Sequence, residues 1–168
     1  MMKISVRAVS PDQIPCLLLP NKGFRLILPN TTVAEIISWQ NPQPQHTANS
    51  DWVLGFFEWR EKRLPLLSIH ISGQVPNDDV QPFTKIAVLN AVSDDLGFSY
   101  YGVALSGTPK LVRVDREDIS TSESEPNHLV VPEKLSLQTS GSKVMLNGEE
   151  AWLPNLDEVE QQVTRLFR

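Results

Sequence analysis

Apolar residues along this chain occur in short runs separated by polar turns, a pattern that predicts strands rather than long helices. Two such runs, 16–20 and 24–28, flank a loop whose Gly23 suits the positive φ of a tight hairpin turn. In the second run, every other residue is large and apolar, so these side chains fall on one face of a strand. Residues 16–28 are therefore predicted to form a hairpin.

The next segment, 31–39, fits two periodicities. Val33, Ile36 and Ile37 would share a helical face, but the same stretch also alternates as a strand does. Its many β-branched residues favour a short turn followed by a strand. A polar loop that contains prolines is expected over 41–50.

The rest of the chain repeats the arrangement of strand, turn and strand. The clearest hairpin signal is Asn147-Gly148, because Asn-Gly favours the type I′ turn between antiparallel strands. A second loop is expected over 72–82, and the acidic, polar residues 120–127 predict a mobile segment. The remaining expected strands cover 52–69, 85–90, 98–105, 110–114, 144–146 and 149–152.

A helix is expected only near the end of the chain. From residue 155 onward, Leu156, Val159, Val163 and Leu166 recur at helical spacing, with acidic residues first and arginines last, as a helix dipole favours. Many short strands with one helix predict a mainly β fold, either a barrel or a sandwich. The run of paired hairpins allows two small barrels.

Composition narrows the class of protein. The 168 residues, 40% of them apolar, are expected to form one domain with its own core. Thirteen prolines favour short segments over a helical bundle, and a net charge of -5 without a long basic cluster argues against nucleic-acid binding. With no apolar stretch near about 20 residues and no signal-peptide pattern, we expect a cytoplasmic protein without membrane insertion.

No constellation of reactive residues predicts catalysis, so the chain is not expected to be an enzyme. His46, His70 and His128 are not at metal-ligand spacing, and neither a metal nor a cofactor is expected. Phosphate-binding glycine loops and Gly-x-Ser-x-Gly elbows are absent. The single cysteine, Cys16, excludes an internal disulfide and is expected to be a buried strand residue; a cysteine-dependent enzyme would need a histidine beside it.

One expected turn carries residues suited to protein binding. Trp59 immediately precedes Arg60 at the tip of the 52–69 hairpin, and an aromatic beside an arginine is typical of interface hot spots. Two alternatives stay open: Trp59 folds back over a barrel, and Arg60 is an exposed charge that keeps a sheet edge from aggregating. The other tryptophans are expected to be core residues: Trp39, Trp52 and Trp152.

The 52–69 segment resembles the signature hairpin of CheW-like domains. That family's pattern is aliphatic-Gly-aliphatic-aliphatic-Asn-Leu-Arg-Gly and then aliphatic-Pro-aliphatic-aliphatic-Asp, with Gly55, Arg60 and Pro65 at the matching places here. The resemblance depends on the order and spacing of several motifs more than on any single motif. This order is kept from about Pro15 to about Gln162. The further matching segments are Val33-Ala34-Glu35-Ile36-Ile37, Gly102-Val103-Ala104-Leu105, 111–114 and 147–159.

The resemblance implies two five-stranded, SH3-like β-barrels that share an apolar core, as two subdomains of a single CheW-like domain over 1–168. It implies an adaptor that binds the regulatory domain of a CheA-type histidine kinase and the cytoplasmic tip of a chemoreceptor. Length and divergence are closer to the auxiliary adaptors of pilus-linked (twitching-motility) chemosensory systems, of the ChpC or PilI kind. The expected protein-binding residues are Val33, Glu35, Ile36, Ile37, Glu58, Trp59, Arg60, Glu61 and Arg63.

The tip departs from the family pattern. In place of Asn-Leu-Arg-Gly the chain has Glu58-Trp59-Arg60-Glu61, and the later aspartate is Ser68. Because glutamate adopts positive φ less readily than glycine, the turn is expected to differ or to lengthen. These departures leave an alternative function open, a β-barrel module that binds a peptide or a small molecule without coupling to a kinase.

Overall fold

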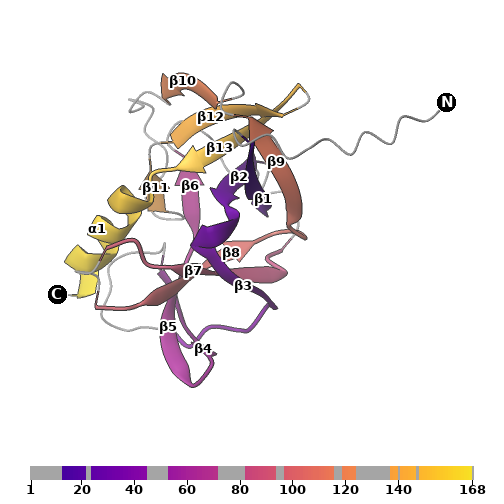
Figure 1. Cartoon of the computed structure of the whole chain (residues 1–168). Coiled ribbons are helices and arrows are strands. Elements are labelled where there is room, and N and C mark those ends of the chain that lie inside the picture. Colours follow the sequence, from indigo (N-terminus) through magenta and orange to yellow (C-terminus); the bar gives the residue numbers. More distant parts are fainter. Residues whose placement is uncertain are drawn as a thin grey trace.

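The computed structural model describes residues 13–21, 24–44, 53–71, 82–93, 97–115, 119–123, 137–139, 141–146 and 148–167. Within these ranges the protein is built mainly from β-strands that form two barrels, with one α-helix along their side (Figure 1). The mainly β fold with a C-terminal helix is the one that the sequence predicts.

The first barrel is formed by a six-stranded sheet with the strand order β10-β12-β13-β2-β1-β9. Its two edges, β9 and β10, follow each other in the chain, which ends β9 at Asp115 and begins β10 at Ile119. The chain therefore connects the two edges of the sheet directly. Counted together as one long strand, β9 and β10 close a barrel of five strands. The strands are β1 (Gln13–Asn21), β2 (Phe24–Pro29), β9 (Lys110–Asp115), β10 (Ile119–Glu123), β12 (Gly141–Leu146) and β13 (Glu149–Pro154).

The second barrel is formed by a five-stranded sheet with the order β3-β7-β8-β5-β4. The chain that follows β3 closes this barrel, because Gln43 and Phe56 of β4 exchange two backbone hydrogen bonds, with N···O distances of 2.8 and 2.9 Å. One stretch of chain thus pairs first with β7 and then with β4. The strands are β3 (Val33–Ser38), β4 (Val53–Trp59), β5 (Lys62–Leu67), β7 (Lys85–Asn90) and β8 (Tyr100–Leu105).

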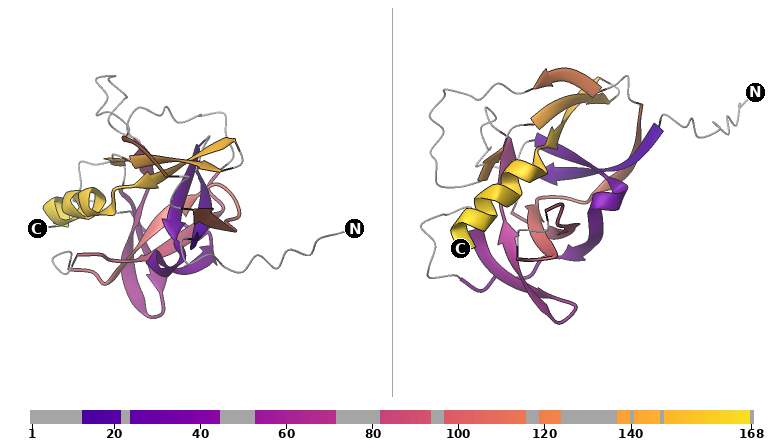
Figure 2. Two further views of the ribbon diagram at one scale, coloured as in Figure 1. Left: turned by 45° about the horizontal axis from the view of Figure 1, so that its top comes forward. Right: turned by 60° about the vertical axis from the view of Figure 1, so that its left-hand side comes forward.

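Four smaller elements complete the described structure. A single 3-10 turn, η1 (Asn30–Thr32), leads from the first barrel into β3. A short parallel pair joins β6 (Ile69–Ile71) to β11 (Leu137–Thr139). The helix α1 (Leu156–Phe167) follows β13 and lies against the junction of the two barrels (Figure 2).

The buried apolar residues form three clusters. The interior of the first barrel holds Cys16, Leu18, Ile27, Val114, Val144 and Ala151. The interior of the second barrel holds Phe57, Trp59, Leu64, Leu66, Ile86, Val88 and Ala104. The largest cluster, here called the shared core, joins both barrels and α1 through Leu19, Leu26, Leu28, Leu67, Ile69, Ala87, Leu89, Tyr101, Val103, Leu105, Trp152, Leu156, Val159 and Val163.

Several strands are buried on both faces because they stand between a barrel interior and the shared core. In β7, Ile86 and Val88 belong to the barrel interior, whereas Ala87 and Leu89 belong to the shared core. Successive side chains of a strand point to opposite faces, so a strand in this position must be apolar at every residue. This requirement explains the continuous apolar runs in the sequence.

One buried carboxylate holds α1 to the β7–β8 hairpin. Glu160 is only 1% exposed and accepts hydrogen bonds from the backbone N–H groups of Val92 (2.9 Å) and Ser93 (2.7 Å) and from the hydroxyl of Tyr101 (3.1 Å). Burial, together with the negative charge of Glu160, raises the pKa of Tyr101, so that this hydroxyl stays protonated and acts as a hydrogen-bond donor to the carboxylate. The helix is therefore fixed by polar bonds as well as by its apolar face.

Most of the strand predictions are confirmed. The structure has hairpins at β1–β2, β4–β5, β7–β8 and β12–β13, with Gly148 at φ +81° in the last turn, and it has the terminal helix. The prediction of a mobile segment over 120–127 is wrong for 120–123, which lie in β10 and pair with β12. Ladder hydrogen bonds come from the backbone, so a polar sequence can form an edge strand. Residues 1–10, 45–50, 72–81 and 124–127 lie outside the described residues.

The double periodicity of 31–39 has a structural cause. A turn followed by a strand is confirmed, but the β3–β7 register shifts between Val33 and Glu35. This β-bulge adds one residue to β3, so Val33 and Ile36 both pack against the shared core, while Ile37 packs against the interior of the second barrel. A bulged strand thus reproduces the spacing of a helical face.

We predict that Gly55→Ala destabilises the protein by about 2 kcal/mol or more. Gly55 has φ +139°, and a Cβ there would overlap the carbonyl group of Gln43, which closes the second barrel. Gly148→Ala is the matched control, because Gly148 also has positive φ but a Cβ there would meet open space. Urea-induced unfolding measures both variants, and equal losses of stability would contradict the role assigned to the Gln43 contact.

Candidate protein-docking site

The tip of the β4–β5 hairpin is a two-residue turn. Trp59 and Lys62 are the last paired residues, and Arg60 and Glu61 between them have φ values of +48° and +64°. Two successive positive φ angles are the type I′ geometry that usually contains Asn or Gly. The turn is not lengthened, which was one of the two expected outcomes: it has two residues, and both are L-residues with side chains in the left-handed conformation.

Trp59 folds back over the second barrel and is not an exposed interface residue, so the structure selects one of the two alternatives left open by the sequence. Its side chain is 6% exposed and lies in the barrel interior, with its ring centroid 4.8 Å from that of Tyr100. Arg60 remains at the surface, with 68% of its side chain exposed, and its guanidinium lies 4.6 Å from the centroid of the Trp59 ring. The indole thus serves as a platform for the arginine.

Glu35 of β3 connects the tip to the neighbouring strand. Its Oε2 accepts a hydrogen bond of 2.6 Å from Nε1 of Trp59 and lies 3.6 Å from Nη2 of Arg60. The first contact satisfies a buried indole N–H, which is costly to leave unpaired. The second is an exposed ion pair, of a kind that contributes little to stability. Glu35, Trp59 and Arg60 thus form one contact group, here called the tip junction.

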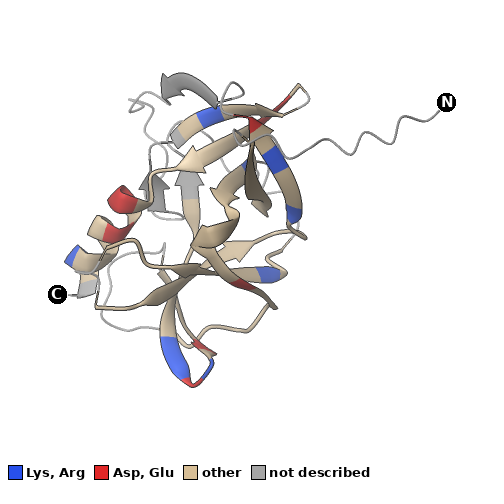
Figure 3. Ribbon diagram, viewed as in Figure 1, with Lys and Arg blue, Asp and Glu red and all other residues tan. Residues whose placement is uncertain are grey.

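The hairpin concentrates charge at one end of the molecule (Figure 3). Besides Arg60, Lys62 lies with its Nζ 4.9 Å from the centroid of Tyr100, and the guanidinium of Arg63 lies 4.5 Å from that of Phe56. Each cation therefore stands over an aromatic ring, an arrangement that holds a charged side chain in place. Glu58 and Glu61 are also exposed there, so the tip presents charges of both signs.

The expected apolar residues of β3 do not share one face. Val33 and Ile36 are half-buried against the shared core, and Ile37 is half-buried on the opposite side of the strand. Ala34, between them, is exposed. The structure therefore brings Glu35 to the tip but separates Val33 and Ile36 from it.

Two residues near the tip were not predicted from the sequence. Tyr100 packs on Trp59, and the ammonium group of Lys62 lies over its ring; the side-chain amide of Gln40 donates a hydrogen bond to the carbonyl of Glu58 at 3.1 Å. Both are distant from the hairpin in the chain, so only the closed barrel brings them together. No local pattern could have indicated either one.

Other candidate chemistries have no support among the described residues. Cys16 is buried, and burial raises the pKa of its thiol, which disfavours the nucleophilic thiolate. The described part of the chain holds no group of three or more His, Cys, Asp or Glu side chains placed to bind a metal. No helix described in the structure has the length and apolar character that crossing a membrane requires. Trp152 is in the shared core and Trp39 is half-buried on Phe83, whereas Trp52, His46 and His128 lie outside the described residues.

Comparisons with known proteins agree with this architecture. A family model described as the CheW-like domain matches residues 16–131. Among solved structures, the chain is similar to the scaffolding protein TtCheW from Thermoanaerobacter tengcongensis, with a TM-score of 0.61, 11% identity, and coverage of 89% of this chain and 88% of that one. At this identity the likeness shows the fold, two SH3-like barrels. No curated protein matches the sequence.

We predict that Glu61→Gly stabilises the protein by about 1 kcal/mol, because glycine adopts positive φ without the steric cost that Glu61 carries. Glu58→Gly is the control: Glu58 is an exposed residue of β4, where glycine should lower stability by about 0.5–1 kcal/mol. Chemical denaturation measures both variants. A loss of stability in Glu61→Gly would show that the turn is not strained.

We also predict that the two contacts of Glu35 differ in strength. Glu35→Ala leaves the N–H of a buried indole unpaired and should lower stability by about 1–2 kcal/mol, with a change in Trp59 fluorescence. Arg60→Ala removes only the exposed partner and should change stability by less than about 0.5 kcal/mol. If Arg60→Ala costs as much as Glu35→Ala, the ion pair holds the junction and the indole bond does not.

Proposed function

The chain belongs to the CheW-like domain family, and we propose from this membership that it is a non-enzymatic adaptor of a bacterial chemosensory pathway. In this role it couples chemoreceptors to a CheA-type histidine kinase in the cytoplasm. The observation that carries the proposal is the tip junction, a fixed and exposed set of charges on a CheW-like domain, the fold that the scaffolding protein TtCheW also has. A rigid surface loses little conformational entropy when a partner binds it.

Two separate surfaces serve the two partners. The charged tip, from Glu58 to Arg63, binds the cytoplasmic tip of the receptor, with Arg60 as the exposed cation at its end. Its planar guanidinium can bind a carboxylate or a row of carbonyl groups. The exposed part of β3 at Ala34, between the half-buried Val33 and Ile36, docks the regulatory domain of the kinase.

Coupling between the partners is mechanical. Glu35 belongs to β3 and also contacts Trp59 and Arg60 at the tip, so a partner that moves either element acts on the other. The adaptor holds receptor and kinase in a fixed register, and a shift of the receptor changes the populations of kinase states. No chemical step on the adaptor is needed for this.

We assign the protein to the auxiliary adaptors of pilus-linked systems rather than to the standard flagellar coupler. The altered residues of the tip support this assignment, because Glu58 and Glu61 add negative charge beside the arginine. A receptor that fits this tip must offer cations as well as carboxylates, so a standard receptor tip is a poorer partner.

We predict that Arg60→Ala weakens binding to the cognate chemoreceptor tip by about 30-fold or more, as expected for a buried interface contact worth about 2 kcal/mol. Arg113→Ala, which removes an exposed cation of β9 in the other barrel, is the matched control and should bind normally. Ala34→Arg should block the kinase regulatory domain while receptor binding is kept, because the added side chain lies on the exposed side of β3. Titration calorimetry with each purified partner gives the affinities, and unchanged binding in Arg60→Ala and Ala34→Arg excludes both proposed surfaces.

A further inference from the structure

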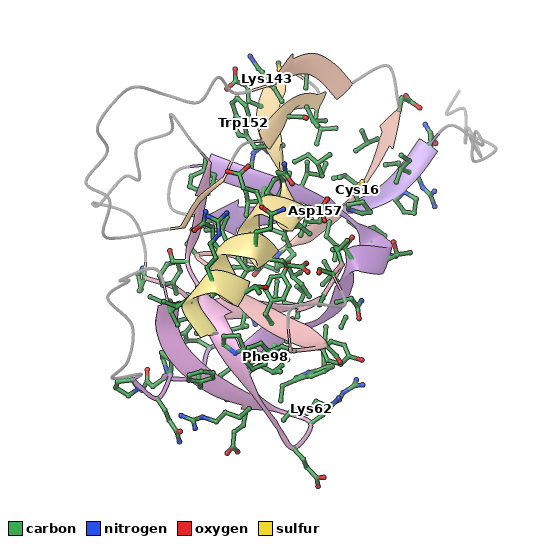
Figure 4. All side chains as sticks on the ribbon, turned by 90° about the vertical axis from the view of Figure 1, so that its left-hand side faces the viewer. Cys16, Lys62, Phe98, Lys143, Trp152 and Asp157 are labelled. Carbon is green, nitrogen blue, oxygen red and sulfur yellow. The ribbon has the colours of Figure 1, made fainter. Side chains whose placement is uncertain are left out.

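A cavity of about 360 Å³ lies where the end of the β1–β2 hairpin meets β13 and the turn after β8. Its wall includes the aromatic side chains of Phe24 and Trp152 and the polar side chains of Asn21, Arg25 and Glu150. Figure 4 shows Trp152 and Lys143 at the end of the molecule opposite to Lys62 of the β4–β5 hairpin. The cavity is therefore remote from the tip of the β4–β5 hairpin, and its size falls in the range of small-molecule sites.

Two buried polar atoms of residues that line the cavity, Oδ1 of Asn21 and Nε1 of Trp152, have no partner among the described residues. Asn21 is 2% exposed and donates one amide hydrogen to the carbonyl of Ile69 at 3.0 Å, but its Oδ1 accepts no hydrogen bond there. Trp152 is 9% exposed, and its indole N–H donates to none of the described residues. Buried polar atoms are normally paired, so an acceptor and a donor without a partner among the described residues are available to a ligand that pairs with both.

The charges around the cavity are balanced in pairs. Nη1 of Arg25 bonds to Oε2 of Glu149 at 2.8 Å, and Nζ of Lys143 bonds to Oε1 of Glu150 at 2.6 Å. Arg25 also donates through Nη2 to the carbonyl of Glu150 at 3.1 Å, which fixes its guanidinium. Each of these cations is thus paired with a carboxylate, so the charges beside the cavity largely offset each other. The site therefore suits an uncharged molecule.

We propose that this cavity binds a small, uncharged, planar amide. An amide offers a carbonyl oxygen to the indole N–H of Trp152 and an N–H to Oδ1 of Asn21, and a planar ring can pack against Phe24 and Trp152. The same chemistry occurs in free aromatic amides and in the amide group of a peptide. The site would make the protein responsive to a ligand in addition to its partners, and it does not depend on the docking surfaces.

The test is a titration of the whole chain with two amides, monitored by proton–nitrogen NMR with the indole N–H of Trp152 as the reporter. Benzamide represents a free aromatic amide, and N-acetylphenylalaninamide represents the amide group of a peptide. The ligand that binds more tightly identifies the source. We expect saturable binding with a Kd below about 1 mM for at least one of them. Benzoate, which has the same ring and a negative charge, should bind at least about tenfold more weakly.

Two variants and one control decide the assignment. Asn21→Ala and Trp152→Phe each remove one open polar group and should each weaken binding about tenfold, and Trp152→Phe keeps an aromatic ring in the shared core. Asn90→Ala is the matched control, because the Asn90 amide also donates to a carbonyl, that of Thr31 at 3.1 Å, but lies outside the cavity. For Trp152→Phe, backbone amide shifts of Phe24 and Arg25 replace the indole signal.

The proposal is overturned if neither amide shifts the Trp152 signal, since the cavity then holds only water. It is also overturned if benzoate binds as tightly as benzamide, or if folded Trp152→Phe binds the amide as the unaltered chain does. Because receptor and kinase binding are measured separately, any of these results leaves the adaptor role untouched.

Discussion

The architecture depends on the burial of strands on both faces. The shared core takes Leu19, Leu26 and Leu28 from the first barrel and Leu67, Ala87 and Leu89 from the second, while the alternate residues of the same strands fill the barrel interiors. A one-residue slip in any of these strands would exchange the two sets of side chains. The barrels therefore specify each other, and neither can be regarded as an independent unit with a solvent-exposed sheet face.

Among the described residues, this packing restricts where the molecule can meet a partner. The central strands are covered, so exposed and well-fixed groups occur at the edges and at the hairpin ends. The tip junction is such a place: Trp59 is held inside the barrel, and Arg60 rests on it with Glu35 beside them. The structural stability of the barrel is thus used to position a surface charge. Such a division of labour suits an adaptor, whose partners must meet a constant geometry.

The sequence predicts the elements of this fold better than their junctions. Apolar runs and turn residues such as Gly148 suffice for the hairpins, since these signals are local. The short turn at Arg60 and Glu61 could not be predicted, because its strain is offset by contacts with Glu35 and by the packing of Trp59. The polar strand β10 could not be predicted from the sequence, because β12, the strand with which it pairs, lies far along the chain. For the site, the charged tip was found, whereas Tyr100 and the cavity around Asn21 require the folded barrels.

The order of strands along the chain has a consequence for how the protein forms. The five strands of the second barrel lie between β2 and β9, and β1 pairs with β9 from Gln13–Asp115 to Leu18–Lys110. During synthesis the β1–β2 hairpin emerges first, yet its long-range neighbour appears only after the whole inserted barrel has left the ribosome. Closing so long a loop is entropically costly unless the intervening chain has already become compact. The inserted segment should therefore become compact early and bring β1 and β9 together, while the shared core is completed only when both barrels are present.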